Sequence, residues 1–265
     1  MQLYIYLKGA ITNAIKYLPL LQNLISRNLK KKYRRSILGY LWTVLNPLLV
    51  MLIMNFVFSE MFKRSIPNYP VYLVSGRVMF FFITGSTQSM SRSIIGNGNL
   101  MRKTRVPYHM FSLANFGTSV VDFLFSLIAF AIVLVFTKSP VTIHVITFPL
   151  TVLAMFMFSY GLGMVLAVTN TFVQDVGQIY GVITTAWMYL TPIFYAIEDM
   201  PVQARQIIRN FNPAFPYLEL TRIAFLQHQW PPQGLLLAAF GWGIGFSILG
   251  LAVYAKTKDK LILYV

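Results

Sequence analysis

Residues Ser112–Phe136 read SLANFGTSVVDFLFSLIAFAIVLVF, an apolar run with one charged residue, Asp122. A run of about 17–25 predominantly apolar residues has the length that crosses a bilayer as a helix. The run is continuously apolar and does not alternate with period two, so it does not fit a barrel strand. Because lipid offers the backbone no hydrogen-bond partners, the run is predicted to be a transmembrane helix.

Further runs of this kind lie on both sides of the first. The full set is Ile37–Phe58, Val71–Met90, Ser112–Phe136, Val145–Thr169, Ile179–Ile197 and Leu235–Ala255. We therefore expect an all-α integral membrane protein with six transmembrane helices in a single domain, residues 1–265. Its expected parts are an interfacial N-terminal segment (1–36), a six-span bundle (37–255) and a cytoplasmic tail (256–265).

The composition agrees with a membrane protein. Apolar residues make up 57% of the chain and charged residues 11%, whereas a soluble domain has about 25% charged residues. The 4 Trp, 15 Tyr and 22 Phe residues argue against intrinsic disorder. The absence of cysteine excludes disulfides, thiolate metal sites and a cysteine nucleophile. We expect no cleavable signal peptide, because no basic region precedes an apolar stretch with a small-residue cleavage site.

The net charge of +15 raises the question of nucleic acid binding, which the position of the charges disfavours. Eight of the 22 Lys and Arg residues lie in residues 1–36 and three close the chain, so the basic residues flank apolar runs. With a cytoplasmic N-terminus, fifteen basic residues lie inside and six outside, which predicts that both termini are cytoplasmic. The remaining one, Arg77, is predicted inside a span near its outer end.

Two segments do not read as spans. Residues Leu3–Ile25 place apolar side chains on one helical stripe, which predicts an amphipathic helix in the inner interface, kinked or divided at Pro19. The alternative is a basic leader whose apolar residues pack on other helices. Residues Glu198–Pro232 are too polar to span, but their Phe211–Phe225 piece either dips into the bilayer from outside or forms an ordinary extracellular loop.

The sequence predicts no catalytic residue and no metal site. It contains no Gly-x-x-x-x-Gly-Lys-Ser/Thr phosphate loop and no His-Glu-x-x-His motif, and its three histidines fall in different predicted loops. Charges inside spans are functional candidates by default. Asp122 is therefore either functional or a polar contact within the bundle, and Arg77 either faces an anionic substrate or snorkels to the interface.

Aromatic residues gather near the predicted span ends. An interfacial aromatic belt explains most of them, and the alternative is a pathway whose flat faces stack on sugar rings. The pathway candidates from this reasoning and from the span charges are Tyr40, Trp42, Arg77, Phe81, Trp187 and Tyr195.

Several stretches, in order, resemble the permease subunits of ABC-2 type exporters that move lipid-linked cell-surface polysaccharides, a family similar to type V ABC transporters. The first is RNLKKKYRRSILGYLWTVLNP (Arg27–Pro47), and the second is IIGNGNLMRKTRVP (Ile94–Pro107). The third runs from Asn170–Asp175 through Thr191–Tyr195 to Phe211–Pro213. Together they cover most of the chain.

The chain departs from the family pattern at two places. Gln174 stands where the family often has a basic residue just before the acid, here Asp175. Gly76 is followed by Arg77 and Val78, where the family commonly has an apolar residue and Pro. Arg77 is therefore a feature of this protein, not one that the family pattern supplies.

The resemblance implies a homodimer of permeases in the bacterial cytoplasmic (inner) membrane, served by two separate ATPase subunits that bind ATP and Mg. It implies no cofactor in this chain. It also implies re-entrant helices after the fifth span and a cytoplasmic loop, about Ser93–Val106, that docks on the ATPase. The candidate coupling residues are Ser93, Asn97, Asn99, Arg102, Lys103 and Arg105.

The leading prediction is thus an ATP-driven exporter of an O-antigen, capsular or teichoic acid chain. Basic residues near the N-terminus are charged to attract the pyrophosphate head of its lipid carrier; they are Lys8, Lys16, Arg27, Lys30, Arg34 and Arg35. The alternatives are a stand-alone membrane glycosyl or lipid-phosphate transferase and an ABC-2 exporter of drugs or small lipids.

Overall fold

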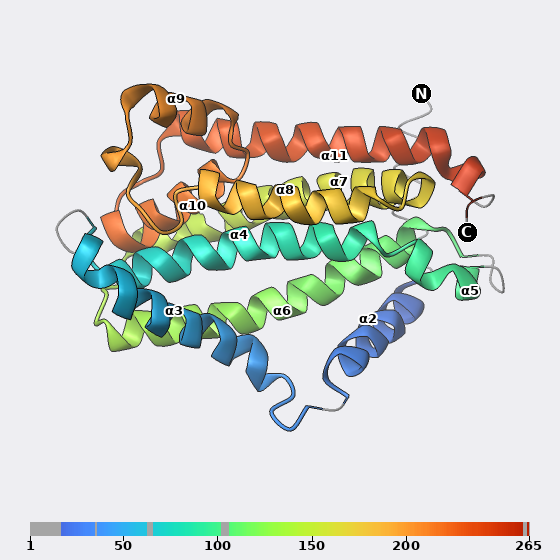
Figure 1. The fold of residues 1–265 in the computed structure, drawn as a ribbon, viewed down its shortest axis with the longest axis horizontal. Coiled ribbons are helices and arrows are strands. Elements are labelled where there is room, and N and C mark those ends of the chain that lie inside the picture. Colours follow the sequence, from blue (N-terminus) through green and yellow to red (C-terminus); the bar gives the residue numbers. More distant parts are fainter. Residues whose placement is uncertain (1–16, 35, 63–65, 102–105, 262–263, 265) are drawn as a thin grey trace.

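The computed structural model describes residues 17–34, 36–62, 66–101, 106–261 and 264. Every regular element among these residues is a helix. Four long helices run side by side along the longest axis of the molecule (Figure 1); they are α4 (Tyr69–Ser91), α6 (His109–Phe136), α7 (Phe148–Phe172) and α11 (Gln233–Leu261). Two further helices, α3 (Leu41–Phe62) and α8 (Val176–Leu190), flank this bundle.

Shorter elements gather at the two ends of the bundle (Figure 1). At one end lie α2 (Leu18–Tyr33), η1 (Ile95–Asn97) and α5 (Gly98–Met101). The connections at the other end contain η2 (Ile143–Thr147), η3 (Ile197–Asp199), α9 (Val202–Phe211), α10 (Phe215–Arg222) and η4 (Ile223–Gln227). The predicted cytoplasmic segments therefore share one end, and the predicted outer segment between α8 and α11 lies at the opposite end.

Each predicted apolar run overlaps a helix, although the runs Ile37–Phe58 and Ile179–Ile197 extend beyond theirs. Within the described ranges, three helical stretches are long and apolar enough to cross a membrane, namely His109–Phe136, Ile143–Phe172 and Gln233–Leu261, and Leu41–Val57 is a shorter apolar helix. The all-helical prediction is confirmed, whereas this criterion supports three membrane spans and not six. Helix α8 ends at Leu190, before the predicted end at Ile197, because Thr191 is extended and precedes Pro192.

The start of the described chain differs from the predicted interfacial helix Leu3–Ile25. Residues 1–16 lie outside the described part, and α2 begins at Leu18 with Pro19 in its first turn, where proline is tolerated. Leu24 is buried, and Ile25 packs against Gly117 of α6. The described part of this segment therefore packs on α6, a contact that both an interfacial helix and the alternative permit.

The main core lies between α4, α6, α7 and α10. Its aromatic centre joins Phe82 to Phe123 and Phe156, with ring centroids 4.9 and 4.8 Å apart. Helix α10 packs into this core, because Tyr217 and Leu218 are fully buried. Residues Phe215–Phe225 of the predicted piece Phe211–Phe225 are consequently packed in the bundle, whereas Phe211 is 73% exposed.

Helices α7 and α11 approach each other through small residues. A Cβ on Gly161 would meet backbone atoms of Phe246, and a Cβ on Gly250 would meet the carbonyl oxygen of Gly161. A Cβ on Gly243 would lie 2.8 Å from the carbonyl oxygen of Ala154. Close approach of helix backbones at small residues is the packing mode expected in a membrane, where no hydrophobic effect drives helices together.

Candidate functional site

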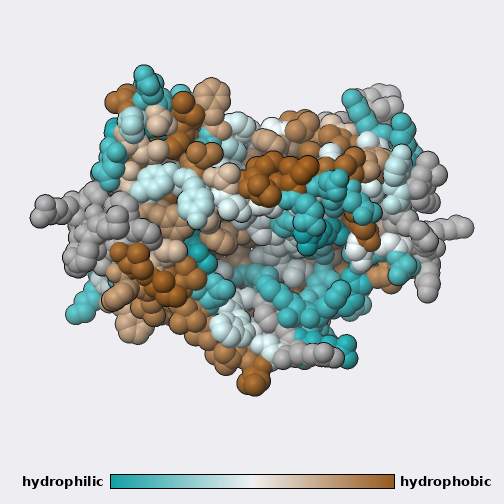
Figure 2. Space-filling view, viewed as in Figure 1, coloured by the Kyte–Doolittle hydropathy of each residue, from teal (hydrophilic) through white to brown (hydrophobic). Residues whose placement is uncertain are grey.

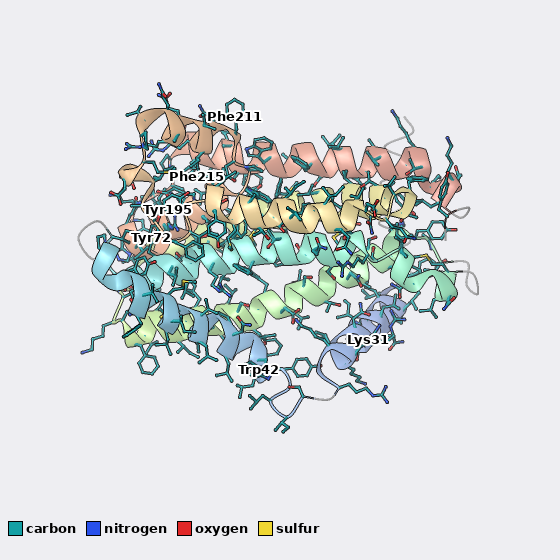
Figure 3. All side chains as sticks on the ribbon, in the orientation of Figure 1. Lys31, Trp42, Tyr72, Tyr195, Phe211 and Phe215 are labelled. Atoms are coloured by element: carbon teal, nitrogen blue, oxygen red, sulfur yellow. The ribbon has the colours of Figure 1, made fainter. Side chains whose placement is uncertain are left out.

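A large cleft lies between α2, α3, α4 and α6, with a volume of about 1220 Å³. In the space-filling view, hydrophilic surface gathers over α2 and beside the hollow, while the surface over α3 is hydrophobic (Figure 2). Lys31 on α2 and Trp42 at the start of α3 come from two different walls of this cleft (Figure 3). Gly39, whose φ of +47° lies in the left-handed region, helps the chain turn between these walls.

The cleft is strongly cationic. Helix α2 contributes three basic residues, Arg27, Lys31 and Lys32. Arg77 lies in α4, and Arg92 directly follows that helix. Asp122 is the one carboxylate among the lining residues that the structure describes. Its Oδ2 lies 2.9 Å from Nζ of Lys32, with side chains 25% and 49% exposed. The excess of positive charge suits a ligand with more than one negative charge.

Asparagines line the inner part of the cleft and hold α2 in place. Asn28 Nδ2 donates to Asn115 Oδ1 at 2.8 Å, and Asn115 Nδ2 donates to the Ser89 carbonyl at 2.9 Å. Arg27 donates to Asn97 Oδ1 at 2.6 Å, which joins α2 to η1. These contacts leave a polar, hydrogen-bonding wall inside an otherwise apolar bundle.

Arg77 faces the same cleft, deeper in the bundle. Its guanidinium carbon lies 4.2 Å from the centre of the Phe81 ring, and its Nη2 donates to Asn46 Oδ1 at 3.4 Å. A guanidinium over an aromatic face gains electrostatic attraction. Arg77 is therefore oriented by α3 and α4 together, at a point where it shares one cavity with Arg27 and Lys32.

The structure divides the predicted pathway residues between separate places. Trp42, Arg77 and Phe81 line the cleft, while Tyr40 stacks on Phe125 with ring centroids 5.8 Å apart. The other two lie at the far end of the bundle. Trp187 packs on Phe80 and donates to Asn212, and the Tyr195 hydroxyl donates to the Tyr189 carbonyl at 2.9 Å.

The predicted coupling residues also divide. Ser93 is buried and its Oγ lies 2.7 Å from Ser112 Oγ, so its side chain holds α6. Asn97 and Asn99 line the inner end of the cleft, and Asn97 Nδ2 donates to the Ser93 carbonyl at 2.7 Å. The basic members Arg102, Lys103 and Arg105 lie outside the described residues.

Of the predicted head-group residues, Arg27 lines the cleft. Lys30 and Arg34 are exposed on or just after α2 and are not among its lining residues. Lys8, Lys16 and Arg35 lie outside the described residues. The basic segment therefore reaches the cleft through one face of α2, and Lys31 and Lys32 belong to that face as well.

Sequence reasoning missed several polar residues of the cleft. Asn46 and Asn115 interrupt predicted apolar spans. They could have been identified, because polar side chains within a span usually face protein or a cavity.

Arg222, outside the cleft, was predicted among the six outer basic residues, yet it is 2% exposed. Its Nη2 donates to the Pro192 carbonyl at 2.7 Å and its guanidinium lies 3.5 Å over the Tyr72 ring.

Comparison with known proteins places the chain among transport proteins. Residues 19–226 match the family described as ABC-2 type transporter. The chain is 29% identical to the O-antigen export system permease protein RfbA of Myxococcus xanthus, covering 92% of this chain and 95% of that one. It is 28% identical to the RfbA protein of Klebsiella pneumoniae, covering 91% and 93%. The capsule polysaccharide export inner-membrane protein CtrC of Neisseria meningitidis is 25% identical over 70% of this chain and 71% of its own length.

Proposed function

The chain belongs to the ABC-2 type transporter family, and on that basis we propose that it is the permease subunit of an exporter of a lipid-linked cell-surface polysaccharide. Similarity to O-antigen export permeases over more than nine tenths of the chain supports this assignment. The relatives are named as permeases and export proteins, which favours transport over a membrane transferase. The place of action is the bacterial cytoplasmic membrane, with the polysaccharide leaving on the outer side.

The proposed topology has six spans, with α3, α4 and α8 crossing beside the three long apolar helices. The N-terminal segment and the end of α11 lie on the cytoplasmic side, as the distribution of basic residues favours. Helices α9 and α10 form the re-entrant outer segment. The burial of α10 against α4, α7 and α11 supports this arrangement, because backbone that dips into a membrane must be covered by protein.

The chain works with ATPase subunits that supply energy and with a second copy of itself that completes the transport pathway. A separate ATPase subunit binds ATP and Mg, and the segment from Ser93 to Val106 contacts it. Two copies of this chain and two ATPase subunits form the complete exporter. The exposed apolar side chains on α3 and α8 face either lipid or the second copy in this arrangement.

The cleft receives the anionic head of the lipid carrier in this proposal. The single observation that carries this step is the gathering of Arg27, Lys31, Lys32 and Arg92 around one cavity beside the predicted inner end of the bundle. Hydrogen bonds from Arg and Lys to a pyrophosphate are charge-assisted and stronger than neutral ones. A partly covered cleft screens these charges less than a flat surface does.

Removal of two cleft charges tests the proposal. Arg27→Gln combined with Lys31→Gln removes two charge-assisted contacts, each worth about 1.5–3 kcal/mol, so export falls at least tenfold. Lys256→Gln, an exposed change near the end of α11, serves as the control and leaves export unchanged. The measurements are surface-exposed polymer in cells and assembly of the purified complex.

Two outcomes would contradict the proposed function. Normal export by the double variant, with the control also normal, would remove the cleft from the route. Turnover of a sugar-linked lipid by the purified chain without any ATPase would instead favour a membrane transferase.

A further inference from the structure

Helix α8 is held to the bundle in an unusual way. Of its residues, only Gly177 and Tyr180 are buried. Several of its apolar side chains, including Ile179, Val182 and Ile183, are more than half exposed. Packing against the core is limited to a few of its side chains, Trp187 and Met188 among them, and polar contacts at its two ends add to it.

The inner end of α8 is held through its backbone. Asn170 Oδ1 accepts a hydrogen bond from the Gly177 N–H at 2.7 Å, and Gln88 Nε2 donates to the Gly177 carbonyl at 3.0 Å. Asn170 Nδ2 donates in turn to the Ser91 carbonyl at 2.9 Å. One turn further along α8, Thr87 Oγ1 lies 2.7 Å from the Tyr180 hydroxyl. The inner ends of α4, α7 and α8 are thereby joined at one residue.

Gly177 is required at this position by space. A Cβ there would lie 2.9 Å from Asn170 Oδ1, and Asn170 is only 3% exposed and has no room to retreat. Displacing the inner end of α8 would break both hydrogen bonds of Gly177. Its N–H, its carbonyl and the side-chain amide of Gln88 would then lose their partners. Each such group carries a full desolvation penalty, so this end is fixed.

The outer end of α8 is held mainly by side-chain contacts, together with a longer hydrogen bond from Asn212 Nδ2 to the Leu190 carbonyl at 3.4 Å. Trp187 Nε1 donates to Asn212 Oδ1 at 2.8 Å, and Asn212 Nδ2 donates to Thr191 Oγ1 at 2.9 Å. Asn212 lies between α9 and α10, in the outer segment where Figure 3 labels Phe211 and Phe215. Its Oδ1 also accepts from the Ala214 N–H at 3.0 Å, so this oxygen keeps a partner when Trp187 leaves.

We propose that α8 acts as a lever in the transport cycle, fixed at Gly177 by Asn170 and released at its outer end by opening of the Trp187–Asn212–Thr191 contacts. Asn170 and Asn212 are positioning residues in this inference, which rests on the proposed export function. Asn170 also donates to the carbonyl of Ser91, two residues before Ser93, where the proposed ATPase-contacting segment begins. Movement of that segment is thereby transmitted through Asn170 to the inner end of α8. The outer end of α8 then moves away from α9 and α10.

A reversible cross-link tests whether the outer end must open. The chain has no cysteine, so Thr191→Cys with Asn212→Cys provides a unique pair, joined by a short bifunctional methanethiosulfonate reagent in the assembled permease–ATPase complex. We expect the linked complex to remain assembled, to lose export by at least tenfold, and to recover when a reductant cuts the link. The single variants Thr191→Cys and Asn212→Cys are each compared before and after the same treatment, and we expect the reagent to cause no further change in the export of either one.

Trp187→Phe gives a second test that does not depend on cross-linking. Phenylalanine keeps one ring against Phe80 but lacks the second ring and the N–H of the indole, which weakens the outer contact. We expect assembly to be normal and the ATP hydrolysed per polymer exported to rise at least threefold. A purely structural role would lower assembly and leave this ratio unchanged.

The inference is overturned if the linked pair exports as well as the unlinked pair, or if Trp187→Phe leaves the ATP-to-export ratio at the wild-type value. These results differ from failure of the proposed function. If the proposed function is wrong, the unmodified complex itself exports no polysaccharide, and there is no export to compare between linked and unlinked forms.

Discussion

Arg77 and Arg222 show how one residue type takes two roles within the same bundle. Arg77 reaches into the cleft, where Phe81 and Asn46 orient it. Arg222 is enclosed by Tyr72, Pro192 and Glu219, the last with a nitrogen-to-oxygen distance of 3.9 Å. A buried charge is tolerated only when it is paired and hydrogen-bonded, so Arg222 joins α10 to α4 and to the segment after α8.

Gly76→Ala tests the packing around Arg222. The added Cβ would lie 2.7 Å from Arg222 Nη2, and that nitrogen cannot move away without losing the Pro192 carbonyl. We expect the free energy of unfolding to fall by about 1–3 kcal/mol, the usual cost of overpacking a core. The measurement is unfolding of the purified chain in mixed micelles by denaturing detergent.

Gly85→Ala in the same helix is the matched control, because nothing lies within 4 Å of its added Cβ. It should gain up to about 1 kcal/mol from helix propensity. Equal stability of the two variants would contradict the role assigned to Gly76.

Arg77→Gln tests the deeper part of the cleft. The change keeps a polar side chain and removes the charge. Export of an anionic polymer should therefore fall about threefold or more, because an exposed ion pair contributes up to about 1 kcal/mol. Arg77→Lys should restore part of the activity. Export by Arg77→Gln at the wild-type level would leave Arg77 with only an anchoring role.

At the level of single residues, the sequence predicts which side chains are unusual but not what they contact. Asp122 is recognisable as the acid within a span, yet its partner Lys32 is 90 positions away and meets it only because α2 folds back along α6. Arg222 falls in a polar segment, and nothing local indicates that α10 is buried. Contacts between distant elements decide both cases.

Helices α7 and α11 provide the closest helix pair of the fold, and their contact carries a prediction for whole elements. Gly161→Val would place side-chain atoms against the backbone of Phe246 in α11. Backbone atoms cannot turn aside as a side chain does, so the helices must separate. We expect a loss of about 3 kcal/mol or more, at the upper end of overpacking costs, or failure to assemble.

Thermal unfolding of the purified chain in detergent measures this loss. Gly245→Ala is the control, since its Cβ would have open space around it. A melting temperature of Gly161→Val equal to that of the control would show that the pair does not determine the stability of the bundle.

Helix positions could be predicted from the sequence because apolar runs are local. The limits of α8 could not, because its end depends on the extended Thr191 and on Asn212, which binds both the Leu190 carbonyl and Thr191. The place of α2 was equally hidden. Its apolar stripe is compatible with a lipid surface or with a protein surface, and the contact of Ile25 with Gly117 depends on a residue 92 positions away.

The molecule as a whole has two chemically different ends, which leads to a topology prediction. Single cysteines at Asn68 and Gln203 should react with an impermeant thiol reagent in intact cells, because they lie at the proposed outer end. A cysteine at Lys258 should resist until the membrane is permeabilised. The absence of native cysteine keeps the labelling specific. Labelling at Lys258 in intact cells would reverse the proposed orientation.

The cleft is a property of the whole molecule that the sequence did not reveal. The resemblance to exporter permeases indicated the class of substrate, and the basic segment indicated attraction to an anionic head. The cavity, however, exists only because α2 packs on α6 while α3 leans across α4 and α6. Its lining residues range from Arg27 to Ser126, and no local pattern connects them.

The glycine contacts also limit how this protein changes over generations. A larger residue at Gly163 would meet the side chain of Met90, so a second substitution that shortens Met90 offers a route to compensation. Gly161 and Gly250 have no such route, because each faces the main chain of the opposite helix, which substitution does not shorten. We therefore expect natural variants to drift at position 163 together with position 90, and to keep glycine at positions 161 and 250 even where the exported polysaccharide differs.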